Sequence, residues 1–336
     1  MRLVKKLLNI ISSMSAAMSN SGRKINYAVR PAKNVERKMM RDLFIRLRSF
    51  SRLEDYRYIG FGSKYFADFI LFHKILNITE MISIESDINN KDRYEFNKPY
   101  SAIKMEWGKS TDALRKLVKQ DEKSIYWMDY DGAFERYMLE DVAIISQTIG
   151  SGGVLALSFN CDKLKIDGEN LENSLHDQLV KMVGKEYVPN KIDTRGWTSS
   201  TRIAIFLKNC IFDKIENILK KRNYSLPEGD HILASQKLFF TYADGAPMAT
   251  LAYVFSSKID QNCIEACHFS DLYFVREGDD PFNISTPNLT IKEIRHLMEI
   301  KPSIEEVNDK IFAENDVKAL WDNYRYFPSF SEIESY

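Results

Sequence analysis

Glycine and acidic residues recur in this chain where short apolar runs stop. Gly60 and Gly62 follow the first such run, Glu85 the second, and Asp129 and Asp131 a later one. A glycine lets the backbone turn sharply and approach a ligand, because no Cβ stands in the way. Glu85 lies 25 residues after Gly60, near the spacing at which a carboxylate accepts from both hydroxyls of a ribose. The spacing therefore predicts a site for a ribose-bearing ligand.

The runs that precede these residues have the character of β-strands. Each is short and rich in β-branched or aromatic residues, and a segment of helical period follows it; the runs cover 56–60, 81–84, 102–105 and 124–128. Such alternation predicts βαβ units and a parallel sheet. Ligands of these sheets bind outside the carboxyl ends of the strands, which is where the glycines and acids stand.

Two further elements complete the predicted sheet. The nearly continuous apolar run 153–159 is typical of a strand buried on both faces, and Asn160 at its end is a further candidate for the site. Runs at 237–242 and 249–255 flank an Asp-Gly turn, which predicts an antiparallel hairpin. We expect an α/β fold with a mostly parallel sheet of seven strands and helices on both faces.

The glycine loop distinguishes between ribose-bearing ligands. A dinucleotide site needs a third glycine where the pyrophosphate meets the helix N-terminus. Tyr65 stands at that position, which disfavours NAD, although an NAD-dependent oxidoreductase stays open as an alternative. S-adenosylmethionine has no phosphates and does not need that opening.

From about Tyr56 to Asn160 the chain resembles the class I S-adenosylmethionine-dependent methyltransferases. The resemblance implies a Rossmann-like sheet, with an antiparallel hairpin at one edge, and S-adenosylmethionine as the cofactor. It implies that the glycine loop faces the methionine part, that the second-strand acid binds the ribose, and that the fourth-strand acid lies beside the methyl group. The cofactor-binding residues carried over in this way are Gly60, Phe61, Gly62, Ser63, Glu85, Lys109, Ser110 and Asp129.

One position departs from that family's pattern. Tyr58 and Ile59 stand where the family usually has an acid just before the first glycine. The resemblance therefore leaves the contact to the methionine amino group unassigned.

Four motifs carry a more specific resemblance, to a bacterial group of O-methyltransferase-like proteins. They are the lead-in Arg30–Lys38, the turn Gly60–Ser63, the strand end Asp129–Gly132 and the hairpin Tyr242–Met248. Because they are spread from residue 30 to residue 248, the resemblance extends over most of the chain. The resemblance implies a methyltransferase but no particular acceptor, so RNA and small molecules both stay open.

The catalytic candidates are Asp129, Tyr130 and Asp131. In a regular strand both acids point to one face, and two close carboxylates repel, so one of them keeps its proton. Either acid would then orient the acceptor or take its proton, with Tyr130 as a wall of the site. The alternative is that one acid caps the following turn and only the other faces the site.

A basic segment precedes the first strand. Its apolar residues predict a helix from about Asn34, as the N-cap, to Phe50. Its charges form either a solvated face or a phosphate-binding stripe, since clustered Lys and Arg meet nucleic-acid phosphates. The stripe would consist of Arg30, Lys33, Arg37 and Lys38.

Composition bounds the remaining possibilities. The 336 residues include 47 basic and 47 acidic ones, so net charge gives no general case for nucleic acid. Four cysteines do not indicate a disulfide scaffold, which favours a cytoplasmic protein, and no apolar run is long enough for a membrane span. Cys263, Cys267 and His268 offer only three ligands, so no metal site is expected.

The expected organisation has three parts: an N-terminal extension 1–25, a methyltransferase-like domain 26–260 with a polar, irregular lid or insertion at 161–198, and a C-terminal extension 261–336. The aromatic residues from Trp321 to Phe330 are expected to pack on the body or on a partner subunit. A rival to the enzyme is a catalytically silent nucleoside-binding or partner-docking module of a multi-protein bacterial system, one directed against phage included. A protein partner or a homo-oligomer is compatible with either function.

Overall fold

Eight strands form one sheet in the computed structural model, which describes residues 30–120, 122–164, 171–243, 245–301, 307 and 311–328. The strand order is β3-β2-β1-β4-β5-β7-β6-β8. The strands are β1 (Arg57–Gly60), β2 (Glu80–Glu85), β3 (Ile103–Trp107), β4 (Ser124–Ala133), β5 (Val154–Asn160), β6 (Ile232–Ala243), β7 (Pro247–Ser257) and β8 (Phe282–Ile284). Strands β1 to β5 run parallel, and β7 is antiparallel to both β5 and β6. The predicted α/β fold with an antiparallel hairpin is confirmed.

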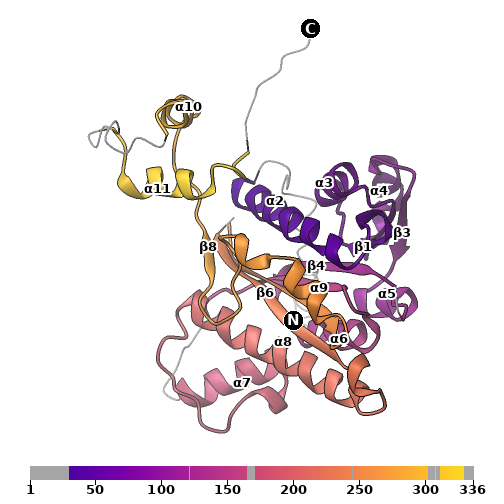
Figure 1. The fold of residues 1–336 in the computed structure, drawn as a ribbon. Coiled ribbons are helices and arrows are strands. Elements are labelled where there is room, and N and C mark those ends of the chain that lie inside the picture. The colour runs from indigo at the N-terminus through magenta and orange to yellow at the C-terminus, as the bar shows by residue number, and fades with distance from the viewer. Residues whose placement is uncertain are drawn as a thin grey trace, which may run out of the picture.

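Helices cover both faces of this sheet (Figure 1). The helices are α2 (Pro31–Arg46), α3 (Ala67–Leu76), α4 (Lys91–Asn97), α5 (Ser110–Leu117), α6 (Arg136–Thr148), α7 (Leu171–Val183), α8 (Ser200–Asn223), α9 (Gln261–Ala266), α10 (Ile291–Glu299) and α11 (Glu314–Asn323). The apolar side chains of α2 and α3 bury one face of the sheet, and those of α5, α6 and α8 bury the other. Among the described helices, none combines the length and the apolar character that a bilayer span requires.

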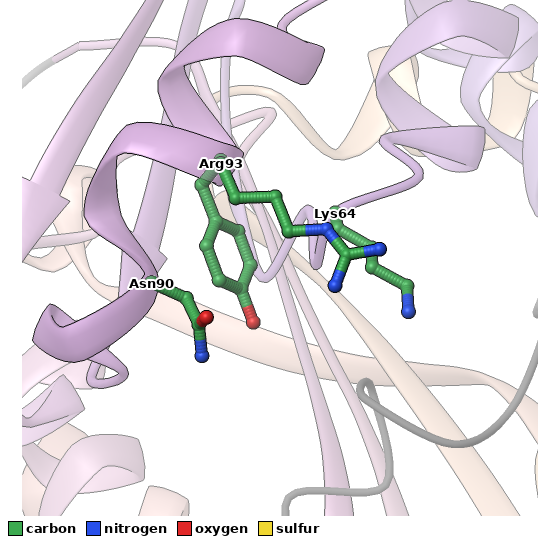
Figure 2. A pocket seen from close by; sticks show the side chains of 4 residues that line it. Lys64, Asn90 and Arg93 are labelled. Atoms are coloured by element: carbon green, nitrogen blue, oxygen red, sulfur yellow. The ribbon is translucent and has the colours of Figure 1, made fainter.

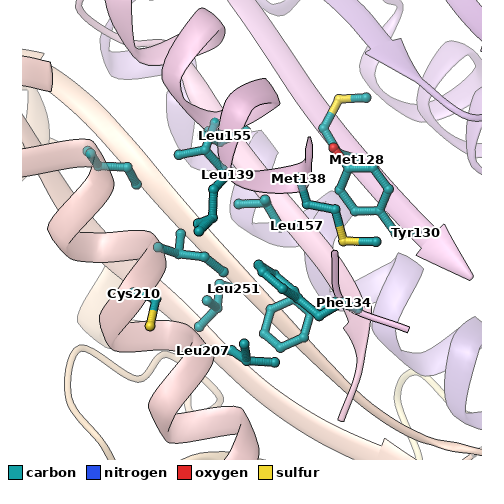
Figure 3. Close-up of a cluster of buried hydrophobic side chains, with 14 of the residues drawn as sticks. Met128, Tyr130, Phe134, Met138, Leu139, Leu155, Leu157, Leu207, Cys210 and Leu251 are labelled. Atoms are coloured by element: carbon teal, nitrogen blue, oxygen red, sulfur yellow. The ribbon is translucent and has the colours of Figure 1, made fainter. Parts of the chain in front are cut away.

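Successive residues of the central strands alternate between the two layers of core. Tyr126 and Met128 of β4 pack with α6 and α8, whereas Ile125 and Trp127 pack with α2 and α3. Figure 3 shows Leu155 and Leu157 of β5 beside Leu139 of α6, and Met128 of β4 in the same cluster. Because both layers are apolar, the acidic residues of β4 are confined to its carboxyl end.

Several boundaries differ from the sequence prediction. Helix α2 begins at Pro31, with Arg30 as the N-cap, because a proline with its fixed φ suits the first helical turn. Asn34 is therefore not the cap, and its side-chain amide instead donates to the Arg30 carbonyl at 3.0 Å. The sheet has an eighth strand, β8, which pairs parallel with β6 and comes from the segment expected to be an extension.

The fourth strand is longer than expected. The sequence predicted a turn at Asp129–Gly132, but these residues lie inside β4, which continues to Ala133. The pairing with β5 shifts between Asp129 and Ala133. This irregularity lets the strand continue past the point where its apolar residues stop.

The segment 161–198 was expected to be polar and irregular, but its described part includes a helix that packs into the core, followed by loop residues. It contains helix α7, whose Leu175, Leu179 and Val183 are buried in the same core as α6 and α8. Trp197 is also buried there, and its indole N–H donates to the Asp193 carbonyl at 2.7 Å. Residues 165–170, like the predicted extension 1–25, lie outside the described residues.

The described aromatic residues near the C-terminus pack on the body of the protein, as predicted. Tyr326 is buried against the core of α2, and its hydroxyl donates to Asp42 at 2.9 Å. Helices α10 and α11 lie to one side of the sheet and share a small apolar cluster around Leu297 and Leu320 (Figure 1).

The turn after β1 can be tested by enlarging its second glycine. A Cβ at Gly62 would lie 2.5 Å from the ring of Phe66 and 2.8 Å from Ser83 Oγ, closer than packed atoms allow. We expect Gly62→Ala to lower the free energy of unfolding by roughly 1–3 kcal/mol, measured by urea denaturation. Gly132→Ala is the control, because a Cβ there meets nothing within 4 Å. Equal stability of the two variants would contradict this packing.

Candidate functional site

The carboxyl ends of β1, β2 and β4 lie level with one another. Gly60 is aligned with Ser83 of β2 and with Trp127 of β4. Glu85 and Asp129 each come two residues beyond those aligned positions, so they stand level with the loop that begins after Gly60. The structure thus brings the predicted glycine loop and two of the predicted acids to one edge of the sheet.

Glu85 has an unusual environment for a carboxyl group. It is half-buried, and burial, together with the charges of Asp131, Asp87 and Asp68, raises its pKa to about 8. The backbone N–H of Ser63 donates to this carboxyl and works in the opposite direction. Glu85 is therefore a carboxyl at a strand end that is held by the glycine loop and surrounded by like charges.

Asp129 is held by a cation from α2. The ammonium of Lys33 lies 2.6 Å from Asp129 Oδ1 and 2.6 Å from Glu36 Oε2. The side chains of Lys33 and Glu36 are almost fully buried, whereas 26% of the Asp129 side chain is exposed. Burial alone would lower the pKa of Lys33, but the two carboxylates outweigh it and raise that pKa, so the cation is permanent.

Hydroxyl groups from three strands complete this network. Thr250 of β7 donates to Glu36 Oε1, and its oxygen lies 2.8 Å from Ser158 Oγ of β5. The indole of Trp127 donates to the same Ser158 oxygen at 2.9 Å. The Tyr242 hydroxyl lies 3.2 Å from Lys33 Nζ and 3.3 Å from Glu36. Every buried charge in the network therefore has hydrogen-bonding partners, as a buried ion pair requires.

This network changes the interpretation of the basic lead-in. Lys33 and Arg37 are buried, with only 3% and 6% of their surface exposed. Lys38 is half-buried and donates to the carbonyl of Tyr326 at 3.0 Å. The structure therefore does not arrange these residues and Arg30 as one solvent-facing phosphate stripe, because the packing of α2 against the sheet turns two of them inward.

The two acids of β4 do not form a matched pair. Asp129 is bound to Lys33 at 2.6 Å. Asp131 is exposed, lies within the shift in pairing between Asp129 and Ala133, and is near enough to Glu85 and Tyr137 to raise the pKa of both. The acids of β4 therefore stand in two different environments.

Three of the other predicted residues have partners inside the protein. Tyr130 is buried, and its hydroxyl donates to Asp141 of α6 at 2.7 Å. Ser110 donates to the same carboxylate at 2.5 Å, and Asn160 accepts from the backbone of Asp162 at 2.7 Å. Tyr130 also packs edge-to-face against Phe61 at 5.3 Å, so it meets the glycine loop through that ring. Lys109 is exposed beside the end of β3.

Several residues that define this edge were missed in the sequence. They are Glu36, Tyr58, Asp68, Asp141 and Thr250. Glu36 had a recognisable signal, because it lies among the apolar residues Ala32, Val35 and Met39 on one face of the predicted helix. A charge at such a position is buried when the helix packs, and it then needs a partner.

A small cavity lies next to the strand ends (Figure 2). Its volume is about 130 Å³, and Lys64, Asn90, Arg93 and Tyr94 line it. Small-molecule sites usually measure roughly 300–1,000 Å³, and none of the predicted cofactor residues borders this cavity. It is a separate feature beside the edge that Glu85 and Asp129 define.

The strand order, the helices on both faces and the acids at the strand ends define a Rossmann-like methyltransferase fold of class I. The chain belongs to the family described as "Putative O-methyltransferase", whose model matches residues 25–335. This confirms the resemblance drawn from the sequence motifs.

The chain is also similar to solved structures, all at low sequence identity. The structure entitled "The structure of LepI complex with SAM" is 12% identical, with a TM-score of 0.34 over 63% of this chain and 46% of that one. An S-adenosylmethionine-dependent methyltransferase from Mesorhizobium loti is 13% identical, with a TM-score of 0.33 over 62% of this chain and 95% of that one. The matched region thus spans less than half of the LepI chain. No curated protein matches the sequence.

The environment of Glu85 predicts a pH-dependent stability. Glu85 has a pKa of about 4.5 in the unfolded chain and about 8 in the folded protein, so between these pH values only the folded state keeps the carboxyl proton. The protonated carboxyl therefore contributes stability that is fully present below pH 4.5 and is lost as the pH rises through 8.

We therefore expect Glu85→Gln, which cannot ionise, to melt a few degrees above wild type at pH 8 to 9 and near wild type at pH 4.5. Differential scanning calorimetry across this range measures the difference. Glu172→Gln on the exposed side of α7 is the control and should track wild type throughout. A Glu85→Gln curve that follows wild type at every pH would show that Glu85 is ionised like an ordinary surface acid.

Proposed function

We propose that this protein is an S-adenosylmethionine-dependent O-methyltransferase. The observation that carries the proposal is the meeting of two carboxyl groups and a glycine loop at one sheet edge, in a chain of the methyltransferase family. One carboxyl is that of Glu85, and the other is that of Asp129, held by Lys33. When bound, the cofactor supplies a methyl group on a sulfonium; the protein's part is binding and positioning.

The residues at this edge suit the parts of that cofactor. Burial and nearby carboxyl groups raise the pKa of Glu85, and the two hydroxyls of a ribose would donate to its ionised form. Gly108 follows β3, whose end flanks the adenine in the class I methyltransferases that the chain resembles, and its φ of 142° favours glycine. A Cβ at Gly108 would meet nothing within 4 Å, so the backbone there borders open space. A flat base has room at this point.

The two acids of β4 take different roles in this proposal. Transfer to an oxygen requires that the acceptor hydroxyl lose its proton, and a nearby carboxylate accepts it. Asp131 suits this role because it is exposed near Glu85, whereas Asp129 is already bound to an ammonium. Tyr130 positions Phe61 of the loop, through the ring contact and its hydrogen bond to Asp141.

The acceptor is open to small molecules, proteins and RNA. Burial of Lys33 and Arg37 removes half of the expected phosphate stripe, and the chain's net charge is zero. Arg37 and Lys38 still line a hollow of about 240 Å³ together with Lys74. All four cysteines are free, which fits the cytoplasmic location proposed for the protein.

Loss of the Glu85 carboxylate should weaken cofactor binding. Charge-assisted hydrogen bonds contribute roughly 1.5–3 kcal/mol, so Glu85→Ala should raise the Kd for S-adenosylmethionine by about tenfold or more. Isothermal titration calorimetry at pH 9, above the pKa of Glu85, gives the comparison under conditions where wild type carries the charge. A folded Glu85→Ala protein that binds as tightly as wild type would place the ribose elsewhere.

Turnover separates the enzyme from a binding module. We expect wild type to transfer radiolabel from S-adenosylmethionine to one of three cell fractions: RNA, protein or small metabolites. Asp131→Asn should abolish the transfer while the Kd for the cofactor stays within a few-fold, because the base is lost but the binding groups remain. Label in no fraction, with the cofactor still bound, would establish a catalytically silent nucleoside-binding module instead. RNA is excluded as acceptor if its fraction stays unlabelled at low salt, where phosphate contacts are strongest.

A further inference from the structure

We propose that Asp129 binds the α-ammonium of the cofactor's methionine part, and that buried Lys33 is the residue that positions Asp129 for it. This inference rests on the proposed function. It assigns the contact to the methionine amino group, for which the sequence before the glycine loop offers no acid.

Tyr58 fills the place where an acid would precede the glycine loop. Its ring is fully buried, and its hydroxyl donates to Asp68 of α3. A Cβ on Gly60 would lie 2.8 Å from the Tyr58 hydroxyl oxygen, so this hydroxyl lies directly beneath the loop. The first strand thus offers the ligand no carboxylate of its own.

Asp68 does not replace it. Only 9% of its surface is exposed, its carboxylate binds the Tyr58 hydroxyl, and Arg37 lies close enough to act on its charge. Burial raises the pKa of Asp68. A ligand at the strand ends would meet this carboxyl only after displacing partners inside the protein.

Asp129 is placed where the missing acid would act. Strands β1 and β4 are direct neighbours, and Gly60 is aligned with Trp127, so Asp129 stands beside the loop that follows Gly60. About a quarter of its side chain, 26%, is exposed, whereas its partner Lys33 is 4% exposed. The fourth strand thus presents a carboxylate at the level of the loop, with its fixed cation behind it.

The charges around Asp129 favour a cation at its exposed side. Lys33 binds Asp129 through Oδ1 and also binds Glu36, whose pKa is raised by burial and lowered by Lys33. A second ammonium at the exposed side of Asp129 would form a charge-assisted hydrogen bond with its carboxylate. Lys33 also fixes the direction of Asp129, because its ammonium lies 4.8 Å from the centre of the Trp127 ring and cannot follow the carboxylate into solvent.

Three ligands test the assignment. S-adenosylmethionine and S-adenosylhomocysteine both carry the α-ammonium, whereas 5′-methylthioadenosine keeps the adenine, ribose and sulfur without it. We expect Asp129→Asn to weaken the first two by about tenfold or more, as loss of a charge-assisted hydrogen bond does. Binding of 5′-methylthioadenosine should stay within twofold of wild type. Calorimetric titration of each ligand measures all three Kd values.

The role of Lys33 needs a variant that still folds. Lys33→Met alone would leave Glu36 as an uncompensated buried charge, so it is combined with Glu36→Gln, which removes one cation and one anion together. The double variant should reproduce the selective loss, although Asp129 is still present. Arg46→Met is the matched control at the other end of the same helix and should bind all three ligands like wild type. Circular dichroism verifies that each variant is folded.

Two results would overturn the inference. One is a folded Lys33→Met/Glu36→Gln or Asp129→Asn protein that binds S-adenosylmethionine like wild type. The other is an equal loss for all three ligands, which would mean that the variants disturb the site as a whole. If the proposed cofactor is wrong, the pattern differs, because wild type would then bind none of the three. A silent module that binds the cofactor is recognised separately, by the absence of methyl transfer.

Discussion

The ammonium of Lys33, enclosed between Glu36 and Asp129, is the interaction on which the carboxyl edge of this sheet depends. Removing one partner from a buried pair of this kind costs about 3–5 kcal/mol, because the other charge stays in the interior. Here the network also joins α2 to β4, β5 and β7 through Asp129, Ser158 and Thr250. Displacement of helix α2 would therefore disturb three strands and the partly exposed Asp129.

A second polar cluster supports the other face of the same edge. Asp141 of α6 accepts hydrogen bonds from Ser110, Thr111 and Tyr130, which come from the ends of α5 and β4. The edge is thus held by a charged network on the α2 face and by hydroxyl groups around one carboxylate on the α6 face. Glu85 lies outside both clusters, and the charges of Asp131, Asp87 and Asp68 act on its carboxyl group.

Sequence reasoning predicted the sheet because its signals are local. The apolar runs, the turn glycines and the spacing to Glu85 each depend on neighbouring residues, and they located β1, β2, β4 and β5 within a residue or two, the carboxyl end of β4 excepted. The partners of Lys33 and Tyr130 could not be predicted in this way, because the bonds to Asp129 and Asp141 form only when separate elements pack. Charge counting along the lead-in left a solvated face and a phosphate stripe open, and both assume exposed side chains, since it could not show which of them α2 turns inward. The irregularity of β4 after Asp129 was equally invisible, because the residues there have the composition of a turn.

The sequence separations within the Lys33 network bear on how the protein folds. Lys33 meets Asp129 across 96 residues, and Glu36 meets Ser158 and Thr250 across 122 and 214 residues. Contacts that close such long loops form late, since the chain entropy must be lost before they stabilise the structure. During synthesis the lead-in leaves the ribosome first, yet its two charges stay in water until the hairpin of β6 and β7 has been made. A nascent chain that already contains the glycine loop and all the acids of β2 and β4 therefore still lacks an ordered site.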